Sequence, residues 1–298
     1  MQGPSAVTVG VFDGVHVGHA ALLARTGERA RELDGPSVAL TFRNHPDAVL
    51  RATEPTPLAT LDERLAAIDH CGIDIACVVD FTPEVRDMTA ARFKDEVLEQ
   101  GLGCRGLVLG FDSAICSRRE GTVERFSELG IAAERIDRVL VGDTVVSSST
   151  IRGALLSGDV TNATTMLGRP HRLCGTVIEG DARGREIGFP TANLAPPDVV
   201  VPARGVYAVH AHVDGHTHDA VANIGTRPTV GDGSTVLIEV HVLDFAGDLY
   251  GTDLQVSFIE RMRDEQHFAS IDELRARIAA DVDEARALFT DREQRIQA

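Results

Sequence analysis

The chain has 298 residues, of which 43% are hydrophobic and 25% are charged. This composition is typical of soluble globular proteins, and the length is sufficient for two domains that each bury a core. The formal net charge of −16 argues against general binding to nucleic acid or to an anionic membrane, because both require a basic surface. No apolar run approaches the roughly 18 residues of a membrane span and no signal segment is recognised, so we expect a cytoplasmic protein.

The five cysteines are Cys71, Cys77, Cys104, Cys116 and Cys174. Their positions show neither CxxC spacing nor a zinc-type pairing with histidine. An odd, scattered set of cysteines is typical of reduced thiols in the cytosol.

The first half of the chain alternates strand patterns with helical patterns. We expect strands over residues 6–9, 38–42, 75–79, 107–109 and 139–146, and helices over 20–33, 61–71 and 89–100. Strands that alternate with helices imply a Rossmann-like parallel sheet, whose ligands bind outside the carboxyl ends of the strands.

A glycine-rich segment lies between the first expected strand and the first expected helix. It reads Gly10-Val11-Phe12-Asp13-Gly14-Val15-His16-Val17-Gly18-His19. Such a turn directs backbone N–H groups and the positive end of a helix dipole at a phosphate. Since His16 and His19 are three residues apart, both rings can lie on one helix face and donate to phosphate oxygens. The alternative is a tight turn with two surface histidines, but the order of Gly, Asp and His after a strand favours a phosphate site.

Hydroxyl residues gather after the last expected strand of this half, in the segment Ser147-Ser148-Ser149-Thr150-Ile151-Arg152. The hydroxyls can cap a helix that begins at Ile151, and that helix end together with Arg152 can hold a further phosphate group. Simple helix capping is the alternative interpretation.

The pattern changes near Gly168, where we place a boundary between domains 1–168 and 169–298. Two short helices precede it, over residues 151–156 and 160–167. Short strands without intervening helices follow it, over residues 173–178, 206–213, 220–224, 236–243 and 254–258. This arrangement implies a small β-barrel, and capping-box spacing at Ser270 and Glu273 predicts a final helix to about Phe289.

A glycine- and arginine-containing loop in the second half could cover phosphates, and it includes Gly180 and Arg185. Shortly after it, Thr191 and Asn193 offer the oxygen ligands that Mg²⁺ prefers. Glu239 lies in an apolar strand, where a carboxylate is usually a solvated, outward-facing residue. Four histidines flank the Asp214-Gly215 turn, and we interpret them as side chains of a hairpin rather than as metal ligands.

The opening segment resembles the His-x-Gly-His turn of the nucleotidyltransferase superfamily, and its longer form resembles the adenylyltransferase half of bacterial bifunctional FAD synthetases. The hydroxyl segment resembles the Ser-Ser-Thr-x-x-Arg element of that family, with Ser149 in place of threonine. The resemblance implies catalytic roles for His16, His19 and Arg152. It also implies a nucleotide site that includes Gly10, Phe12, Asp13, Gly14, Gly18, Ser147, Ser148 and Ser149.

The second half resembles the riboflavin kinase barrel of the same family, so that the resemblance runs from about Val7 to Phe289. It rests on the segments at 180–193, 202–207, 223–229, 239–241 and 248–251. It implies that Glu239 accepts a proton from the flavin ribityl hydroxyl and that Thr191 and Asn193 hold Mg²⁺. Gly180 and Arg185 are then on the nucleotide side, and Arg263 is on the flavin side.

One loop departs from the family pattern. Asp112, Arg119 and Gly121 match it and imply contacts with the flavin nucleotide, but residues 113–116 read Ser-Ala-Ile-Cys where the family carries Phe-Arg-Phe-Gly. The loss of two aromatic faces removes stacking area of about 0.5–1.5 kcal/mol per pair.

The resemblance implies that ATP phosphorylates riboflavin to FMN in the barrel and that a second ATP adenylylates FMN to FAD in the first domain. The expected partners are therefore ATP, riboflavin and FMN, with Mg²⁺ as the metal, and neither nucleic acid nor a membrane. A kinase with a degenerate or differently specific first domain is one alternative. A flavin-binding regulatory protein without turnover is another.

Overall fold

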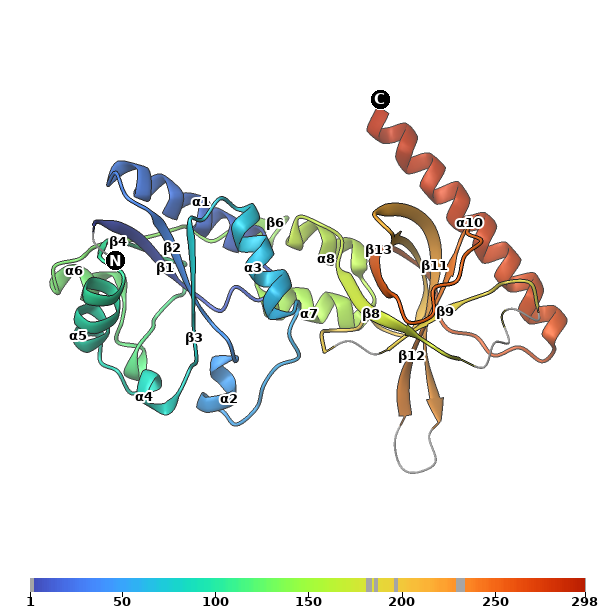
Figure 1. Ribbon diagram of the computed structural model, residues 1–298, viewed down its shortest axis with the longest axis horizontal. Helices are drawn as coiled ribbons and strands as arrows, with labels where there is room; N and C mark the ends of the chain where they lie inside the picture. The colour runs from blue at the N-terminus through green and yellow to red at the C-terminus, as the bar shows by residue number, and fades with distance from the viewer. Residues whose placement is uncertain (1–2, 181–183, 185–186, 196–197, 229–233, 298) are drawn as a thin grey trace. The chain divides into compact units, whose positions relative to one another are not determined.

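The computed structural model describes residues 3–180, 184, 187–195, 198–228 and 234–297. The chain divides into two compact units, Met1–Thr150 and Ile151–Ala298 (Figure 1). The functional boundary that we place at Gly168 stays a prediction. Within the described residues, no helix has both the length and the apolar character needed to cross a membrane.

A parallel sheet forms the centre of the first unit, as the alternating pattern predicts. Its strands lie in the order β3-β2-β1-β4-β5. They are β1 (Ser5–Val9), β2 (Ser37–Phe42), β3 (Ile75–Val79), β4 (Cys104–Leu109) and β5 (Ala132–Arg135). Every pairing in this sheet is parallel, so the carboxyl ends of the strands share one edge.

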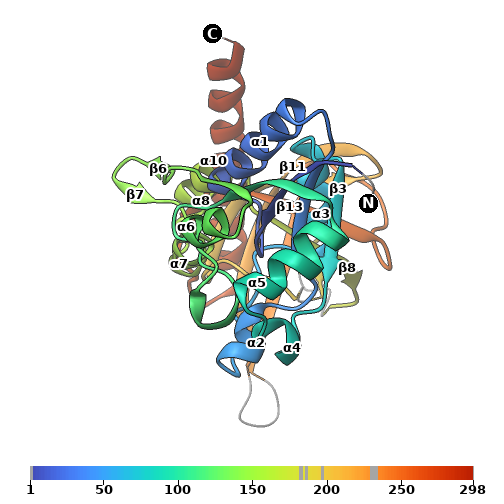
Figure 2. The ribbon, with the colours of Figure 1, turned by 90° about the vertical axis from the view of Figure 1, so that its left-hand side faces the viewer.

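Helices cover both faces of this sheet (Figure 2). On one face, α1 (Val17–Glu32) and α3 (Leu61–His70) contribute Leu22, Leu23 and Ile68 to a buried cluster. On the other face, α5 (Ala90–Arg92) continues as the π-helix η1 (Phe93–Gly101) and packs beside α6 (Val123–Glu128). The shorter helices of this unit are α2 (Pro46–Leu50), α4 (Pro83–Arg86) and η2 (Ser117–Arg119). The predicted helix starts are confirmed at Thr60–Leu61 and at Thr89, where the threonine side chains accept from backbone N–H groups.

The strand expected over residues 139–146 is wrong. The chain instead forms a small hairpin from β6 (Leu140–Val141) and β7 (Thr144–Val145), outside the parallel sheet. Gly142 has a φ of +58° between them, which a continuous strand does not accept. The fifth sheet strand is β5, whose sequence Ala-Ala-Glu-Arg is too short and polar to give a strand signal.

A closed barrel forms the centre of the second unit, which confirms the predicted fold class. Its strand order is β10-β11-β12-β9-β8-β13, and β13 also pairs with β10. The strands are β8 (Arg172–Ile178), β9 (Ala192–Leu194), β10 (Gly205–Val213), β11 (His216–Pro228), β12 (Ser234–Val242) and β13 (Asp253–Arg263). The pattern predicts five of these strands and misses β9, which has only three residues after Pro190.

Among the described residues, helices α7 (Ser148–Ser157), α8 (Val160–Leu167) and α10 (Ile271–Gln297) accompany the barrel. The predicted helices α7 and α8 are confirmed, and α8 packs against β13. The C-terminal α10, red in Figure 1, packs against the outer wall of the barrel through Ala285 and Phe289. It runs two turns beyond the predicted end. The Ser270 hydroxyl caps it by accepting from the Glu273 N–H at 3.2 Å.

Candidate active sites

The turn between β1 and α1 has an unusual backbone. Phe12, Gly14 and Val15 have φ values of 54°, 74° and 38°, so two residues with side chains adopt the left-handed region. The two ends of the turn are tightly packed, because a Cβ at Gly10 would lie 3.1 Å from the Phe12 ring and one at Gly18 would lie 3.2 Å from the His16 ring, so that either ring would have to shift slightly. Strain of this kind persists where surrounding contacts fix the backbone, and it is concentrated at functional sites.

Asp13 fixes this turn from within. Its buried carboxylate accepts from the Leu58 N–H at 2.8 Å, and its backbone carbonyl accepts from the Ser148 hydroxyl at 3.0 Å. Asp13 therefore connects the turn to the loop before α3 and to the first residue of α7. The nucleotide role implied for Asp13 stays a prediction.

Arg64 is a buried residue of this site that the sequence analysis misses. Its two terminal nitrogens donate to the carbonyls of Val11 and Phe42, both at 2.7 Å, at the carboxyl ends of β1 and β2. Burial lowers the pKa of this guanidinium, while the charge of Asp13 opposes that shift. An available signal was the position of Arg64 on the apolar face of α3, three residues after Leu61.

The two histidines stack directly on each other. The ring centroids of His16 and His19 are 3.6 Å apart at 14°, and Phe12 lies edge-on to His19 at 5.3 Å. His16 caps α1, because its Nδ1 accepts from the His19 N–H at 3.2 Å. That bond puts the proton of a neutral His16 ring on Nε2, which makes Nε2 a hydrogen-bond donor. Burial, and then the charge of His16, lower the pKa of His19 well below 6.5, and its Nδ1 has no partner among the described residues.

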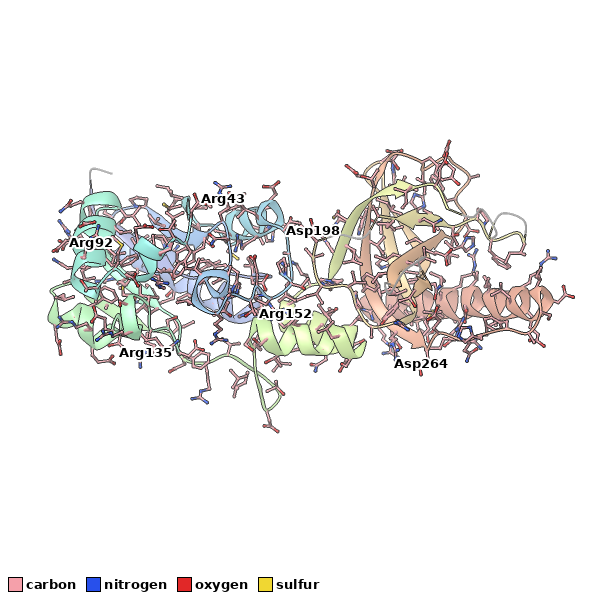
Figure 3. All side chains as sticks on the ribbon, turned by 90° about the horizontal axis from the view of Figure 1, so that it is seen from below. Arg43, Arg92, Arg135, Arg152, Asp198 and Asp264 are labelled. Atoms are coloured by element: carbon pink, nitrogen blue, oxygen red, sulfur yellow. The ribbon has the colours of Figure 1, made fainter. Side chains whose placement is uncertain are left out.

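The hydroxyl segment forms the start of α7, which begins at Ser148, three residues before the predicted start at Ile151. The Ser147 hydroxyl accepts from the Thr150 N–H at 3.1 Å and lies 2.7 Å from the Thr150 hydroxyl, so Ser147 acts as the helix cap. Ser148 binds the turn through Asp13, and Ser149 is exposed. Arg152 follows in the first turns of α7 and is partly buried (Figure 3). The structure thus brings Ser148 to the histidine turn.

In the altered loop at residues 110–121, Cys116 occupies the position of the family's glycine and has a backbone conformation typical of glycine. Cys116 has a φ of 67° and a ψ of 176°, a combination that is essentially restricted to glycine. Arg119 donates to the backbone carbonyl of Asp112 at 3.1 Å, which brings these two predicted flavin residues together. The guanidinium of Arg138 lies 5.5 Å from the centroid of the Phe111 ring.

A cavity of about 460 Å³ lies between the outer wall of the barrel and α10. Its volume is within the usual range of roughly 300–1,000 Å³ for ligand sites. Glu239 and Arg263 contribute to its polar wall, and Phe268 and Ile278 contribute to its apolar wall. Glu239 is therefore not a simple solvated strand residue, since it faces a concave site.

Glu239 is the middle residue of a row that crosses three neighbouring strands. It is opposite Asn193 on one side and opposite Asn223 on the other, and the Asn223 amide donates to its carboxylate at 3.4 Å. All three residues line the cavity. Asn223 is a site residue that the sequence analysis does not single out, because an asparagine within a strand carries no specific signal.

Thr191 lines both the large cavity and a smaller one of about 70 Å³, which Asp248 and Tyr250 also line. Asn193 is buried, and a Cβ at Gly180 would collide with its amide, which explains the glycine there. Side-chain oxygens on the wall of a cavity fit a hard divalent cation. Arg185 lies outside the described residues.

Arg263 is held by α10. Its Nε and Nη2 donate to the two carboxylate oxygens of buried Asp281 at 2.9 and 2.6 Å, and Arg277 donates to the same carboxylate at 2.8 Å. Arg263 thus lies at the cavity wall in a fixed orientation. The histidines at the Asp214-Gly215 turn belong to the β10–β11 hairpin, and no metal-binding cluster of three or more His, Cys, Asp or Glu residues occurs within the described parts of the chain.

The two folds and their sites define a class of protein: a two-domain transferase of phosphorus-containing groups. A family model for FAD synthetase matches residues 1–150, and one for riboflavin kinase matches residues 167–289. A bifunctional riboflavin kinase/FMN adenylyltransferase from Pseudomonas fluorescens is 41% identical over 94% of this chain and 92% of its own length. The Escherichia coli K12 protein of the same name is 39% identical over 95% of this chain and 92% of its own length. The chain therefore belongs to the family of bifunctional riboflavin kinase/FMN adenylyltransferases.

Two further comparisons extend over nearly the whole chain. The Bacillus subtilis strain 168 protein of that name is 35% identical over 97% of this chain and 94% of its own length. A solved structure, described as a macrolide-efflux protein from Streptococcus pneumoniae, has a TM-score of 0.90 and 31% identity, and it covers 96% of this chain and 95% of its own. The predicted family and fold are confirmed, whereas the roles of individual site residues stay predictions.

Proposed function

We propose that the chain carries out both reactions of this family, at two separate sites. In the barrel, the terminal ribityl oxygen of riboflavin attacks the γ-phosphorus of ATP, and FMN and ADP result. In the first unit, a phosphate oxygen of FMN attacks the α-phosphorus of a second ATP, and FAD and pyrophosphate result. The observation that carries the proposal is the presence, in one chain, of the stacked His16–His19 turn and of the cavity lined by Glu239, Thr191 and Asn193.

For the kinase reaction, Glu239 accepts the proton of the attacking hydroxyl. The larger cavity has the apolar wall that a flavin ring requires, and the smaller cavity takes the nucleotide side. Thr191 borders both, which supports phosphoryl transfer at that point. Thr191 and Asn193 hold Mg²⁺, which when bound neutralises charge on the phosphates. Arg263 faces the flavin, and Gly180 and Arg185 belong to the nucleotide loop.

For the adenylyl transfer, the turn acts by orienting phosphates and by stabilising charge. The attacking FMN oxygen is already anionic at neutral pH, so that no strong base is required. The Nε2–H of His16 and the neutral ring of His19 donate to phosphate oxygens as charge develops on the pyrophosphate. Arg152, Ser147, Ser148 and Ser149 contribute the second phosphate contact, at the start of α7. Asp112 and Arg119 meet polar groups of FMN.

The two reactions are assigned to domains 1–168 and 169–298. We infer a cytoplasmic location, which the odd, scattered set of five cysteines supports because oxidising compartments favour disulfides. The net charge of −16 supports small-molecule partners rather than nucleic acid or a membrane surface. Cell fractionation tests the location.

The direct test incubates the purified protein with riboflavin, ATP and Mg²⁺ and resolves the flavins by chromatography. We expect FMN to appear first and FAD to follow. If FMN accumulates and no FAD forms even at saturating FMN, the protein is a kinase alone. If neither product forms, the proposal fails as a whole.

A further inference from the structure

His241 is a residue of the barrel site that the two proposed reactions do not use. It follows Glu239 by two positions on β12, so both side chains leave the strand on the same side. Both line the 460 Å³ cavity. His241 therefore lies beside the proposed base and the proposed metal ligands.

The backbone ladder between β12 and β9 fixes Asn193 but does not extend to Thr191. The ladder pairs Glu239 with Asn193 and Val240 with Ala192, so hydrogen bonds of the sheet fix Asn193 opposite the base. The ladder ends at Ala192. The preceding Thr191 lies outside it, and Pro190 has no N–H with which to continue it.

A side chain of β12 makes a bond at the point where the ladder stops. The Nδ1 of His241 lies 2.7 Å from the carbonyl oxygen of Pro190, and the ring also meets Phe189 edge-on at 5.6 Å and 81°. A carbonyl oxygen only accepts, so the Nδ1 of His241 carries the proton in this bond. The two contacts hold Phe189 and Pro190, which directly precede Thr191.

We propose that His241 is a positioning residue of the kinase site: its bond to the Pro190 carbonyl connects this segment to β12 beyond the end of the backbone ladder and holds Thr191 in line with Asn193 and Glu239. This inference rests on the proposed kinase function. Its consequence is that loss of the bond displaces Thr191 while the ladder still fixes Asn193. Binding of a nucleotide with its divalent metal then weakens, although no metal ligand is changed.

The test uses the full chain and three variants. His241→Phe keeps the ring contact but removes the donor, and His241→Asn restores a donor, since the asparagine amide nitrogen can occupy the place of Nδ1. His216→Phe is the matched control, because the Nδ1 of His216 also lies near a backbone carbonyl, that of Asp214 at 3.1 Å, but at the exposed hairpin turn. Hydrogen exchange with peptide mapping follows residues 187–195 during a titration with MgADP. This local signal does not include nucleotide bound in the first unit.

We expect His241→Phe to raise, by about tenfold, the MgADP concentration at which this peptide is half-protected. This is the effect of losing one hydrogen bond whose free energy is near the upper end of the usual range. His241→Asn should recover most of the wild-type value, and His216→Phe should match the wild type. Adenylylation of supplied FMN should keep its wild-type rate in all three variants.

The proposal is overturned if His241→Phe leaves the MgADP titration and the local exchange unchanged, even where the melting temperature falls, because the role is then structural. It is also overturned if His241→Asn is as impaired as His241→Phe. A failure of the kinase function itself is recognised separately, by the absence of riboflavin phosphorylation in the wild type, since the exchange titration measures binding without turnover.

Discussion

The stacked pair His16–His19 links stability to pH at the residue scale. Since burial and the neighbouring His16 keep the pKa of His19 well below 6.5, the folded chain resists protonation of that ring more than the unfolded chain does. The unfolded state therefore binds more protons as the pH falls below about 6.5. The contribution of His19 to stability is complete above that pH and is lost as the pH falls toward the lowered pKa.

We predict that the first unit loses less stability between pH 8 and pH 5.5 in His19→Asn than in the wild type. Thermal unfolding without ligand at a series of pH values measures this, with the exposed His216→Asn as the control. An identical pH dependence in wild type and His19→Asn would show that the His19 ring is not protected from protonation.

Cys116 gives a second prediction at the residue scale. It occupies a backbone region that costs residues with a side chain about 1–3 kcal/mol, which exceeds the extra unfolded-state entropy of glycine. Cys116→Gly should therefore raise the melting temperature of the first unit by a few degrees. Cys71→Gly, at an ordinary helix end with a φ of −76°, should lower it. A fall in both variants would contradict the strained geometry of Cys116.

At the scale of elements, we predict that the loop of residues 110–121 determines how well FMN is held. Its small side chains cannot clamp a flavin ring as two phenylalanines would, while Asp112 and Arg119 are retained and touch each other. Replacing residues 113–116 with Phe-Arg-Phe-Gly should lower the KM for FMN by about thirtyfold, from two stacking contacts of about 1 kcal/mol each. The KM for ATP should stay constant, because the histidine turn and the start of α7 are unchanged. Tight use of FMN by the unaltered protein would show that the ring is held elsewhere.

The elements that the sequence predicts well are those with a long apolar or periodic pattern. Apolar runs predict β1 to β4 and five barrel strands, because burial on a sheet face requires them. The two missed strands, β5 and β9, are respectively polar and very short. The error at 139–146 has a local cause, since the apolar pattern continues across Gly142 whereas the backbone reverses there.

The site is partly predictable for the same physical reasons. Motif spacing leads to His16 and His19, and the resemblance to the family adds the roles of Thr191, Asn193 and Glu239. The structure places these residues at the turn and in the cavity. Spacing does not lead to Arg64, Asn223 or His241, because their contacts depend on which strands and loops meet in space. Tertiary pairing, rather than local sequence, creates those three contacts.

At the scale of the whole molecule, each unit has its own core. We predict that a fragment beginning at Pro170 folds and phosphorylates riboflavin, and that one beginning at Ile151 is more stable. The longer fragment keeps the bond from the Ala203 N–H to the Leu155 carbonyl at 2.9 Å and the buried Met166 of α8. Melting temperatures and kinase rates of the two fragments measure this. An inactive longer fragment would mean that the barrel depends on the first unit.

The central claim, two independent reactions on one chain, is tested most directly by mixing two variants. Glu239→Gln should lose roughly 10²–10⁴-fold in riboflavin phosphorylation and still convert FMN to FAD. His16→Ala should phosphorylate riboflavin normally and form little FAD. Neither variant alone should then convert riboflavin to FAD efficiently, whereas an equimolar mixture should, because FMN released by one is used by the other. Two independent sites would be contradicted if the mixture formed no FAD. They would also be contradicted if each folded variant lost both activities.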